Sequence, residues 1–94
     1  IVGAGVVISG GTTRRSIISS DVRVHSYATV EDSLILQGVS IGRGATVRRA
    51  IIDKNVVIPD GTQIGVNEAA DRERFTVTES GLVVIGKGDK VKAG

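Results

Sequence analysis

Large aliphatic residues recur along this chain at steps of six, six and five, with polar residues and glycines between them. These steps build a gapless repeat of 17 residues in three copies, residues 14–30, 31–47 and 48–64. Such periodicity is typical of a hexapeptide β-helix, in which each hexapeptide supplies one short strand and one turn. Three hexapeptides make one triangular coil. The pattern therefore predicts an all-β solenoid of about four coils over residues 1–66, stacked at about 4.8 Å.

The inward positions form columns when the three copies are aligned. Val22, Val39 and Val56 make one column, and the other columns are also aliphatic or small. One coil cannot bury its inner face alone, so the stability is expected to come from stacking. The alternative is an ordinary antiparallel sheet of short strands, whose inward positions would alternate at a period of two. The gapless period favours the β-helix.

Residues 1–13 are predicted to hold an earlier coil. Two registers fit these residues, with either Val2 and Ile8 or Ile1 and Val7 facing inward. The pattern leaves that choice open.

The predicted corners hold residues that tolerate a positive φ. Gly adopts that conformation most easily, and Asp and Asn are the next most tolerant. Asp21 and Asn55 occupy the column in which Gly38 sits. The glycines at or near predicted corners are Gly38, Gly42, Gly44, Gly61 and Gly65.

Charged residues are expected to stack along one corner. One column contains Arg14, Glu31 and Arg48, and the next contains Arg15, Asp32 and Arg49. Stacked coils would place each acid between two arginines, in a ladder of exposed pairs worth about 0–1 kcal/mol each. An anion site built by the arginines is the less favoured alternative, because the acids neutralise them locally.

The repeat stops after residue 65, and residues 67–94 are predicted to form a cap and tail. Residues 67–75 read as a short helix with Asn67 as its N-cap and acidic residues in its first turn. A cap would protect the final strands of the solenoid from edge pairing.

Two strands are predicted to follow the helix. Residues 75–78 and 81–85 have strand composition, and residues 79–81 supply the turn between them. The tail over residues 86–94 is basic and rich in glycine. We expect the tail to fray or to dock on a partner.

Composition narrows the classes of protein. The chain has 94 residues with 13 Gly, one Pro, no Cys and only 2% aromatics, which excludes disulfides and requires a core of small aliphatic residues. The net charge of +2 is too small to predict nucleic-acid binding, and no apolar run is long enough to predict a membrane span. No signal peptide is visible, although a fragment would not show one. A cytoplasmic location is expected. With no Met and a start in mid-pattern, the chain reads as a piece of a longer protein.

Candidate chemistry is sparse. His25 is the single His, and hexapeptide β-helices often belong to acyltransferases in which a His is the general base. His25 shares its column with Gly42 and Pro59 at a predicted turn, which favours a solvated corner histidine instead. The sequence contains no nucleophile constellation and no metal-ligand cluster. The remaining cationic candidates are Lys54, Arg72, Arg74, Lys87, Lys90 and Lys92.

The chain resembles the C-terminal domain of ADP-glucose pyrophosphorylase (glucose-1-phosphate adenylyltransferase), the bacterial forms above all. The resemblance covers essentially the whole chain. Its most specific pieces are the RRAIIDK string at residues 48–54, the IPDGT string at 58–62 and the closing segment from Ile64 to Phe75. A generic hexapeptide β-helix does not contain these strings.

The resemblance implies a left-handed coil and a regulatory role. Full enzymes of this family make ADP-glucose and pyrophosphate from ATP and glucose 1-phosphate, for glycogen or starch synthesis. An N-terminal catalytic domain binds the substrates and Mg²⁺, and its absence here implies that this chain alone carries no catalytic residues and no cofactor. The β-helix domain supports assembly, usually as a homotetramer, and helps to bind sugar-phosphate, phosphate or AMP effectors between the domains.

Two site residues follow from the resemblance. Family members place a basic residue after the Asp of the RRxIID motif, here Lys54, and another just after the last strand, here Lys87. Both contact effector phosphate in the family, so Lys54 and Lys87 are expected to lie on one surface facing the catalytic domain. Some relatives use Arg at these positions, whereas Lys binds phosphate as a point charge without a bidentate fork. The tail after Lys87 is also shorter and richer in Gly than in those relatives.

Three alternatives remain open from the sequence. The first is a hexapeptide acyltransferase domain with His25 as base, and the second is the β-helix of another sugar-nucleotide pyrophosphorylase. The paired RRSII and RRAIID strings disfavour the second. The third is an oligomerisation module that binds no ligand.

Overall fold

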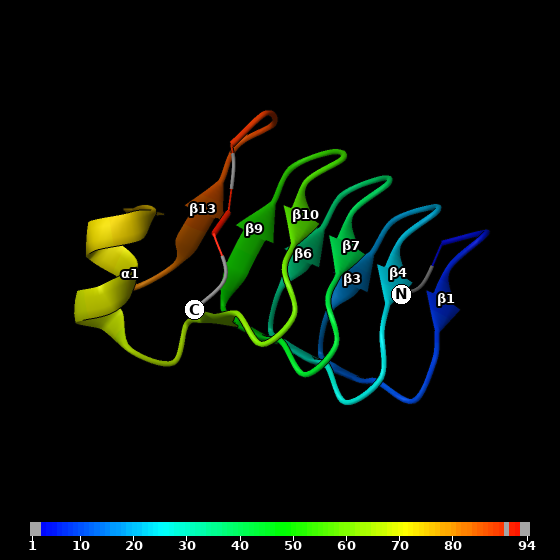
Figure 1. The fold of residues 1–94 in the computed structure, drawn as a ribbon. Coiled ribbons are helices and arrows are strands. Elements are labelled where there is room, and N and C mark those ends of the chain that lie inside the picture. The colour runs from blue at the N-terminus through cyan, green and yellow to red at the C-terminus, as the bar shows by residue number, and fades with distance from the viewer. Residues whose placement is uncertain (1–2, 90, 93–94) are drawn as a thin grey trace.

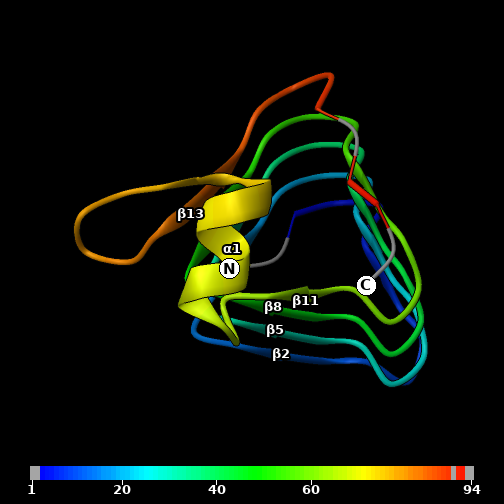
Figure 2. The ribbon, with the colours of Figure 1, turned by 60° about the vertical axis from the view of Figure 1, so that its left-hand side comes forward.

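The computed structural model describes residues 3–89 and 91–92, which form a three-sided parallel β-helix with a helical cap at one end (Figure 1). Viewed from the capped end, the coils superpose as a roughly triangular outline (Figure 2). The predicted solenoid is therefore confirmed.

Each side of the solenoid is a sheet of four parallel strands. Face 1 contains β1 (Val7–Ile8), β4 (Arg23–Val24), β7 (Ser40–Ile41) and β10 (Val57–Ile58). Face 2 contains β2 (Thr12–Arg14), β5 (Thr29–Glu31), β8 (Thr46–Arg48) and β11 (Gln63–Ile64). Face 3 contains β3 (Ile17–Ile18), β6 (Leu34–Ile35), β9 (Ala50–Ile52) and β13 (Val83–Ile85), with β12 (Thr76–Val77) antiparallel at its edge.

The strand register reproduces the repeat. Val24 pairs with Ile41 and Ile41 with Ile58, which is the offset of 17 residues read from the sequence. In the first coil Ile8 pairs with Val24, so the register with Ile8 inward is correct. Ile1 and Val2 lie outside the described residues. Because Thr13 pairs with Val30, the first coil is one residue shorter than the others at the turn near Gly10.

The core consists of the stacked inward columns. Val22, Val39 and Val56 are each at most 2% exposed, and the aliphatic columns around them are buried in the same way. Burying each such side chain contributes about 1.5–3 kcal/mol. Stacking thus supplies the stability that no single coil could provide.

Left-handed residues occupy all three corners. Asp21 and Asn55 have φ of 59°, and Gly38 between them has φ of 75°, as predicted. Gly42 is different, because its φ is not positive and a Cβ there would lie 2.6 Å from the carbonyl oxygen of Ile58. The sequence did not predict positive φ at Tyr27. It also did not predict the left-handed column of Arg15, Asp32 and Arg49.

The cap forms as predicted. Helix α1 (Glu68–Arg74) begins after Asn67, whose side chain accepts a hydrogen bond from the N–H of Ala70 at 3.2 Å. Strands β12 and β13 then form a hairpin, and β13 pairs in parallel with β9. The predicted cap therefore also supplies the fourth strand of face 3. Within the described ranges, no helix has the length and apolar character that a membrane span requires.

One residue of the tail contacts the solenoid. Val91 is half-buried and packs against the core, so this residue does not fray, and docking of the tail on a partner stays a prediction. Lys90, Ala93 and Gly94 lie outside the described residues.

Candidate functional site

The two lysines expected to bind phosphate meet at the corner between faces 3 and 1, which we call corner A. Ile85 pairs with Ile52, so Lys87 and Lys54 each lie two residues beyond a matched pair in adjacent strands. The Asp53 carboxylate joins them, because Oδ1 accepts the N–H of Lys54 at 2.7 Å and Oδ2 accepts the N–H of Lys87 at 3.2 Å. The tertiary structure thus places the two predicted residues on one carboxylate.

The turn after β13 repeats the turn after β9. Gly88 has φ of 85° at the position where Asn55 has φ of 59°. The Asp89 carboxylate closes the turn by accepting the N–H of Gly86 at 2.8 Å. Lys54 and Lys87 are both exposed, and their side chains leave from neighbouring levels, about 4.8 Å apart in the stacking direction.

Corner A carries two lysines, Lys54 and Lys87, and two aspartates, Asp53 and Asp89. The Asp53 carboxylate is engaged with the backbone N–H groups of both lysines, and the Asp89 carboxylate lies in the turn that carries Lys87. Lysine binds phosphate as a point charge, so two lysine side chains that reached the same phosphate could neutralise it without bidentate geometry. A neighbouring cavity of about 410 Å³ does not serve this purpose, because neither lysine lines it. Its lining consists of Asn55, Val57, Pro59, Gly88, Asp89 and Val91.

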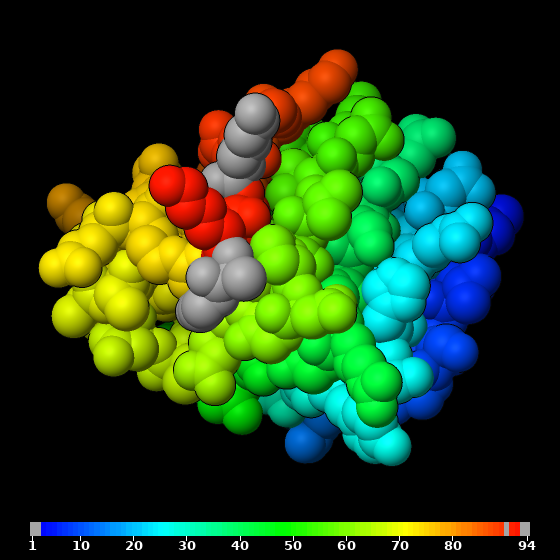
Figure 3. Space-filling view, viewed as in Figure 1, coloured from blue at the N-terminus to red at the C-terminus, as the bar shows by residue number. Residues whose placement is uncertain are grey.

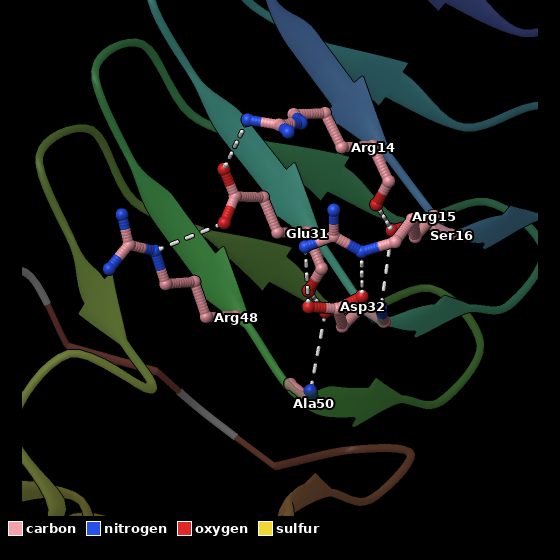
Figure 4. A network of polar contacts seen from close by, with 8 residues as sticks. Arg14, Arg15, Ser16, Glu31, Asp32, Arg48 and Ala50 are labelled. Carbon is pink, nitrogen blue, oxygen red and sulfur yellow. Dashed lines mark hydrogen bonds and ion pairs between the residues drawn. The ribbon is translucent and has the colours of Figure 1, made fainter.

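The charge ladder lies at another corner, between faces 2 and 3 (Figure 4). Glu31 sits between two arginines, with Arg14 at 3.9 Å and Arg48 at 3.5 Å, as predicted. Asp32 instead pairs with Arg15 alone, through contacts of 2.7 and 3.1 Å. Arg49 stacks on the other side of Asp32, as predicted, but forms no ion pair within the described part of the chain.

The Arg15–Asp32 pair has an electrostatic signature. The hydrogen bond from Arg15 lowers the pKa of the Asp32 carboxyl below its ordinary value, and the positive charge of Arg15 acts in the same direction. The same hydrogen bond raises the pKa of Arg15. Both groups are solvent-exposed, so screening limits the stabilisation that they supply.

Serine hydroxyls hold the backbone together beside this ladder. The Ser33 hydroxyl donates to the Glu31 carbonyl at 2.7 Å and accepts the N–H of Ala50 at 3.2 Å. Ser16 repeats the arrangement one coil earlier, accepting the N–H of Ser33 at 3.1 Å. The sequence alignment shows these small residues in one column, but their bridging role depends on the corner geometry.

His25 does not have the surroundings of a general base. Its side chain is exposed, and Nε2 lies 3.3 Å from the Ser40 hydroxyl. Within the described residues, no carboxylate forms a hydrogen bond or ion pair with its ring. The geometry agrees with a solvated corner histidine.

The other cationic candidates serve the cap where the structure describes them. Arg72 pairs with Glu68 at 2.7 Å on helix α1. Arg74 stacks on the Phe75 ring at 4.9 Å and donates from Nη2 to the Lys92 carbonyl. The Lys92 side chain is exposed, and Lys90 lies outside the described residues.

Comparison with known proteins fits this architecture. Residues 1–85 match the family described as GlmU-like, C-terminal hexapeptide. The chain belongs to this hexapeptide family. The hexapeptide domain is also similar to C-terminal regions of proteins named glucose-1-phosphate adenylyltransferase.

Three such relatives show the extent of the match. The hexapeptide domain is 53% identical to the protein of Frankia casuarinae over 94% of this chain, and 53% identical to that of Rhodopirellula baltica over 97%. It is 51% identical to the protein of Deinococcus radiodurans, again over 94% of this chain. The chain spans only 21–22% of the length of these curated relatives.

The organising residue of corner A in this hexapeptide domain is Asp53, which the sequence did not single out. Its position in the RRAIID string was visible, but nothing in the sequence showed that it would bind a turn 34 positions away. Lys54 and Lys87 were found from the sequence because they match basic positions of the family that the chain resembles. The structure adds the group that connects them.

Proposed function

We propose that this chain is the assembly and allosteric-regulatory domain of a glucose-1-phosphate adenylyltransferase. The parent enzyme would make ADP-glucose and pyrophosphate from ATP and glucose 1-phosphate for glycogen or starch synthesis. The names of the relatives support the activity of the parent. The regulatory role is supported by one observation above all, the Asp53 carboxylate that holds the backbones of Lys54 and Lys87 together.

Corner A would take an anionic effector, a sugar phosphate, inorganic phosphate or AMP. A hydrogen bond to a charged group contributes about 1.5–3 kcal/mol, so losing one lysine should weaken binding roughly tenfold or more. An effector changes activity only if it binds one state of the enzyme more tightly than another. The rigid solenoid would supply two cations to such a site. The catalytic domain would supply the rest of the site and would move relative to the solenoid.

The outer surface of face 3 supports this placement of the catalytic domain. The outward positions of the four parallel strands of face 3 are all aliphatic, namely Ile17, Leu34, Ile51 and Val84. The outward positions of face 2 are polar, namely Thr12, Thr29, Thr46 and Gln63. A continuous apolar stripe on one side favours burial against protein. Because face 3 ends at corner A, a domain packed on the stripe would border the lysines.

The test is an activity assay on the full-length enzyme. Pyrophosphate release from ATP and glucose 1-phosphate would be followed with and without fructose 1,6-bisphosphate, fructose 6-phosphate, phosphate and AMP. We expect Lys54→Ala and Lys87→Ala to weaken the effector response while leaving basal turnover intact. Arg23→Ala is the matched control, because it removes an exposed cation from face 1.

Each outcome of this assay has a distinct meaning. An effector response that survives both lysine substitutions would remove the regulatory role from corner A but keep the activity. An enzyme without turnover would overturn the activity itself. Size-exclusion chromatography with light scattering on the same preparations tests the homotetramer, and a monomeric parent would contradict the assembly role.

A further inference from the structure

The tail resumes the hexapeptide spacing after the cap. Val91 lies six residues after Ile85, just as Ile58 lies six residues after Ile52. Val91 packs against the core like the inward residues of a coil, although only half-buried. We call residues 86–89 and 91–92 the strap, because they cross the last coil between corner A and helix α1. Figure 3 shows its red atoms between the yellow helix and the green coil.

Helix α1 is itself fastened to the end of the solenoid. Asp71 is 3% exposed, and its carboxylate accepts the N–H of Gly65 at 3.0 Å, where the last coil ends. Phe75 donates its backbone N–H to the Asp71 carbonyl at 2.7 Å and packs its ring against the core. Arg74 lies between these anchored residues, and stacking on Phe75 orients its guanidinium.

Arg74 connects the anchored helix to the strap. Its Nη2 donates to the carbonyl of Lys92, at the end of the strap opposite corner A. Two cavities, of about 330 and 280 Å³, separate the strap from the helix, and Arg74 and Phe75 line both. The strap is therefore not packed tightly against the helix. The hydrogen bond from Arg74 to Lys92 thus contributes more to holding the strap in place than side-chain packing does.

We infer that Arg74 latches the strap across the end of the solenoid and thereby positions Lys87 beside Lys54. Arg74 is a positioning residue in this scheme, because it acts through Lys87 rather than on the anion. Anion binding by Lys54 and Lys87 rests on the proposed function, whereas the contact between Arg74 and the strap does not. A latch that keeps Lys87 in place raises anion affinity by raising the fraction of molecules in which the site is complete.

The latch is tested first by hydrogen exchange in the full-length protein. The backbone N–H of Lys87 is protected by its bond to Asp53, so release of the strap should expose it. We expect Arg74→Met to speed exchange over residues 83–92 at least threefold, and Arg74→Lys to restore part of the protection. Arg72→Met is the matched control, since Arg72 carries the same charge on the same helix but contacts Glu68 and the Thr78 carbonyl instead of the strap. Unchanged exchange in Arg74→Met would overturn the latch, whatever the anion data show.

The link to the site is tested by phosphate titration calorimetry. Arg74→Met should raise the dissociation constant for inorganic phosphate, but by no more than Lys87→Ala does. In a Lys87→Ala background, Arg74→Met should have no further effect, a result that mere destabilisation would not produce. Equal losses from Arg74→Met in both backgrounds would refute positioning through Lys87. If Lys54→Ala and Lys87→Ala both leave phosphate binding unchanged, the proposed anion site is wrong, while the exchange result still decides the latch.

Discussion

The backbone N–H of Lys87 donates to Oδ2 of Asp53 at 3.2 Å, across a separation of 34 residues. The other carboxylate oxygen holds the N–H of Lys54 at 2.7 Å. One aspartate thus joins the last coil of the repeat to the segment that follows the cap. This link brings the backbones of two surface lysines to a single corner.

Asp53→Asn should loosen this corner selectively. An amide offers one acceptor oxygen where the carboxylate offers two, so Asn can retain the bond to Lys54 but not the bond to Lys87. We expect a loss of about 1 kcal/mol in the free energy of unfolding, measured by urea denaturation of the 94-residue chain. Asp60→Asn is the control, because among the described residues Asp60 accepts through one oxygen, from the N–H of Arg43 at 2.8 Å. Equal losses in both variants would contradict the bridging role of Asp53.

Asp71→Leu should destabilise the cap. The substitution leaves the N–H of Gly65 without its partner, which costs about 1–3 kcal/mol in the free energy of unfolding. Asp71→Asn keeps an acceptor oxygen, so its cost should be smaller. The exposed Glu73→Ala on the same helix should remain within about 0.5 kcal/mol of the parent. We therefore expect the urea midpoint to rise in the order Asp71→Leu, Asp71→Asn, Glu73→Ala. Any other order would contradict the prediction.

Ser33→Ala should cost more than Ser16→Ala. Ser33 is 6% exposed, and its loss strands the N–H of the fully buried Ala50. Ser16 accepts the N–H of Ser33 one coil earlier, at a more exposed position of the same corner. We expect about 1–3 kcal/mol for Ser33→Ala and less for Ser16→Ala, from chemical denaturation of the two variants. A neutral Ser33→Ala would show that the corner relaxes to satisfy the backbone without the hydroxyl.

Two glycine substitutions should separate close packing from backbone preference. Gly42→Ala puts a Cβ 2.5 Å from the backbone nitrogen of Asp60, so a loss of about 3 kcal/mol or more is expected. Gly44→Ala meets no atom within 4 Å but has φ of 70°, so only the left-handed penalty of about 1–2 kcal/mol should appear. Thermal unfolding of the two variants checks this order. A larger loss for Gly44→Ala would be inconsistent with the packing at this corner.

The Arg15–Asp32 pair should make a small pH-dependent contribution to stability. The pKa of Asp32 is lowered in the folded state, so its stabilisation is fully present above the unfolded pKa of about 3.9. The contribution is lost as the pH falls through the folded-state value. The stability difference between the parent and Asp32→Asn should therefore shrink as the pH falls from about 5 to about 2. If the stability difference between the parent and Asp32→Asn stays constant over this range, the Arg15–Asp32 pair is not the source of that difference.

Much of the solenoid was predictable because its signal is local and repeated. The inward columns, the coil length and the left-handed Asp21 and Asn55 follow from a fixed period. Tyr27 could have been predicted at positive φ, since Gly44 and Gly61 occupy its column. The left-handed column of Arg15, Asp32 and Arg49 was harder to predict, because it contains no Gly and Asp32 is its single Asx residue.

The sequence by itself determined which residues face inward, where the repeat ends and that a short helix and a hairpin follow. These features depend on hydrophobic periodicity and on capping chemistry, which act over a few residues. Only the tertiary structure decided that β13 returns to pair with β9 and that the strap continues along the last coil. The pairing of Ile85 with Ile52 spans a segment with no repeat, so backbone hydrogen bonding and burial at the open end select it. That choice brings Lys87 to Lys54.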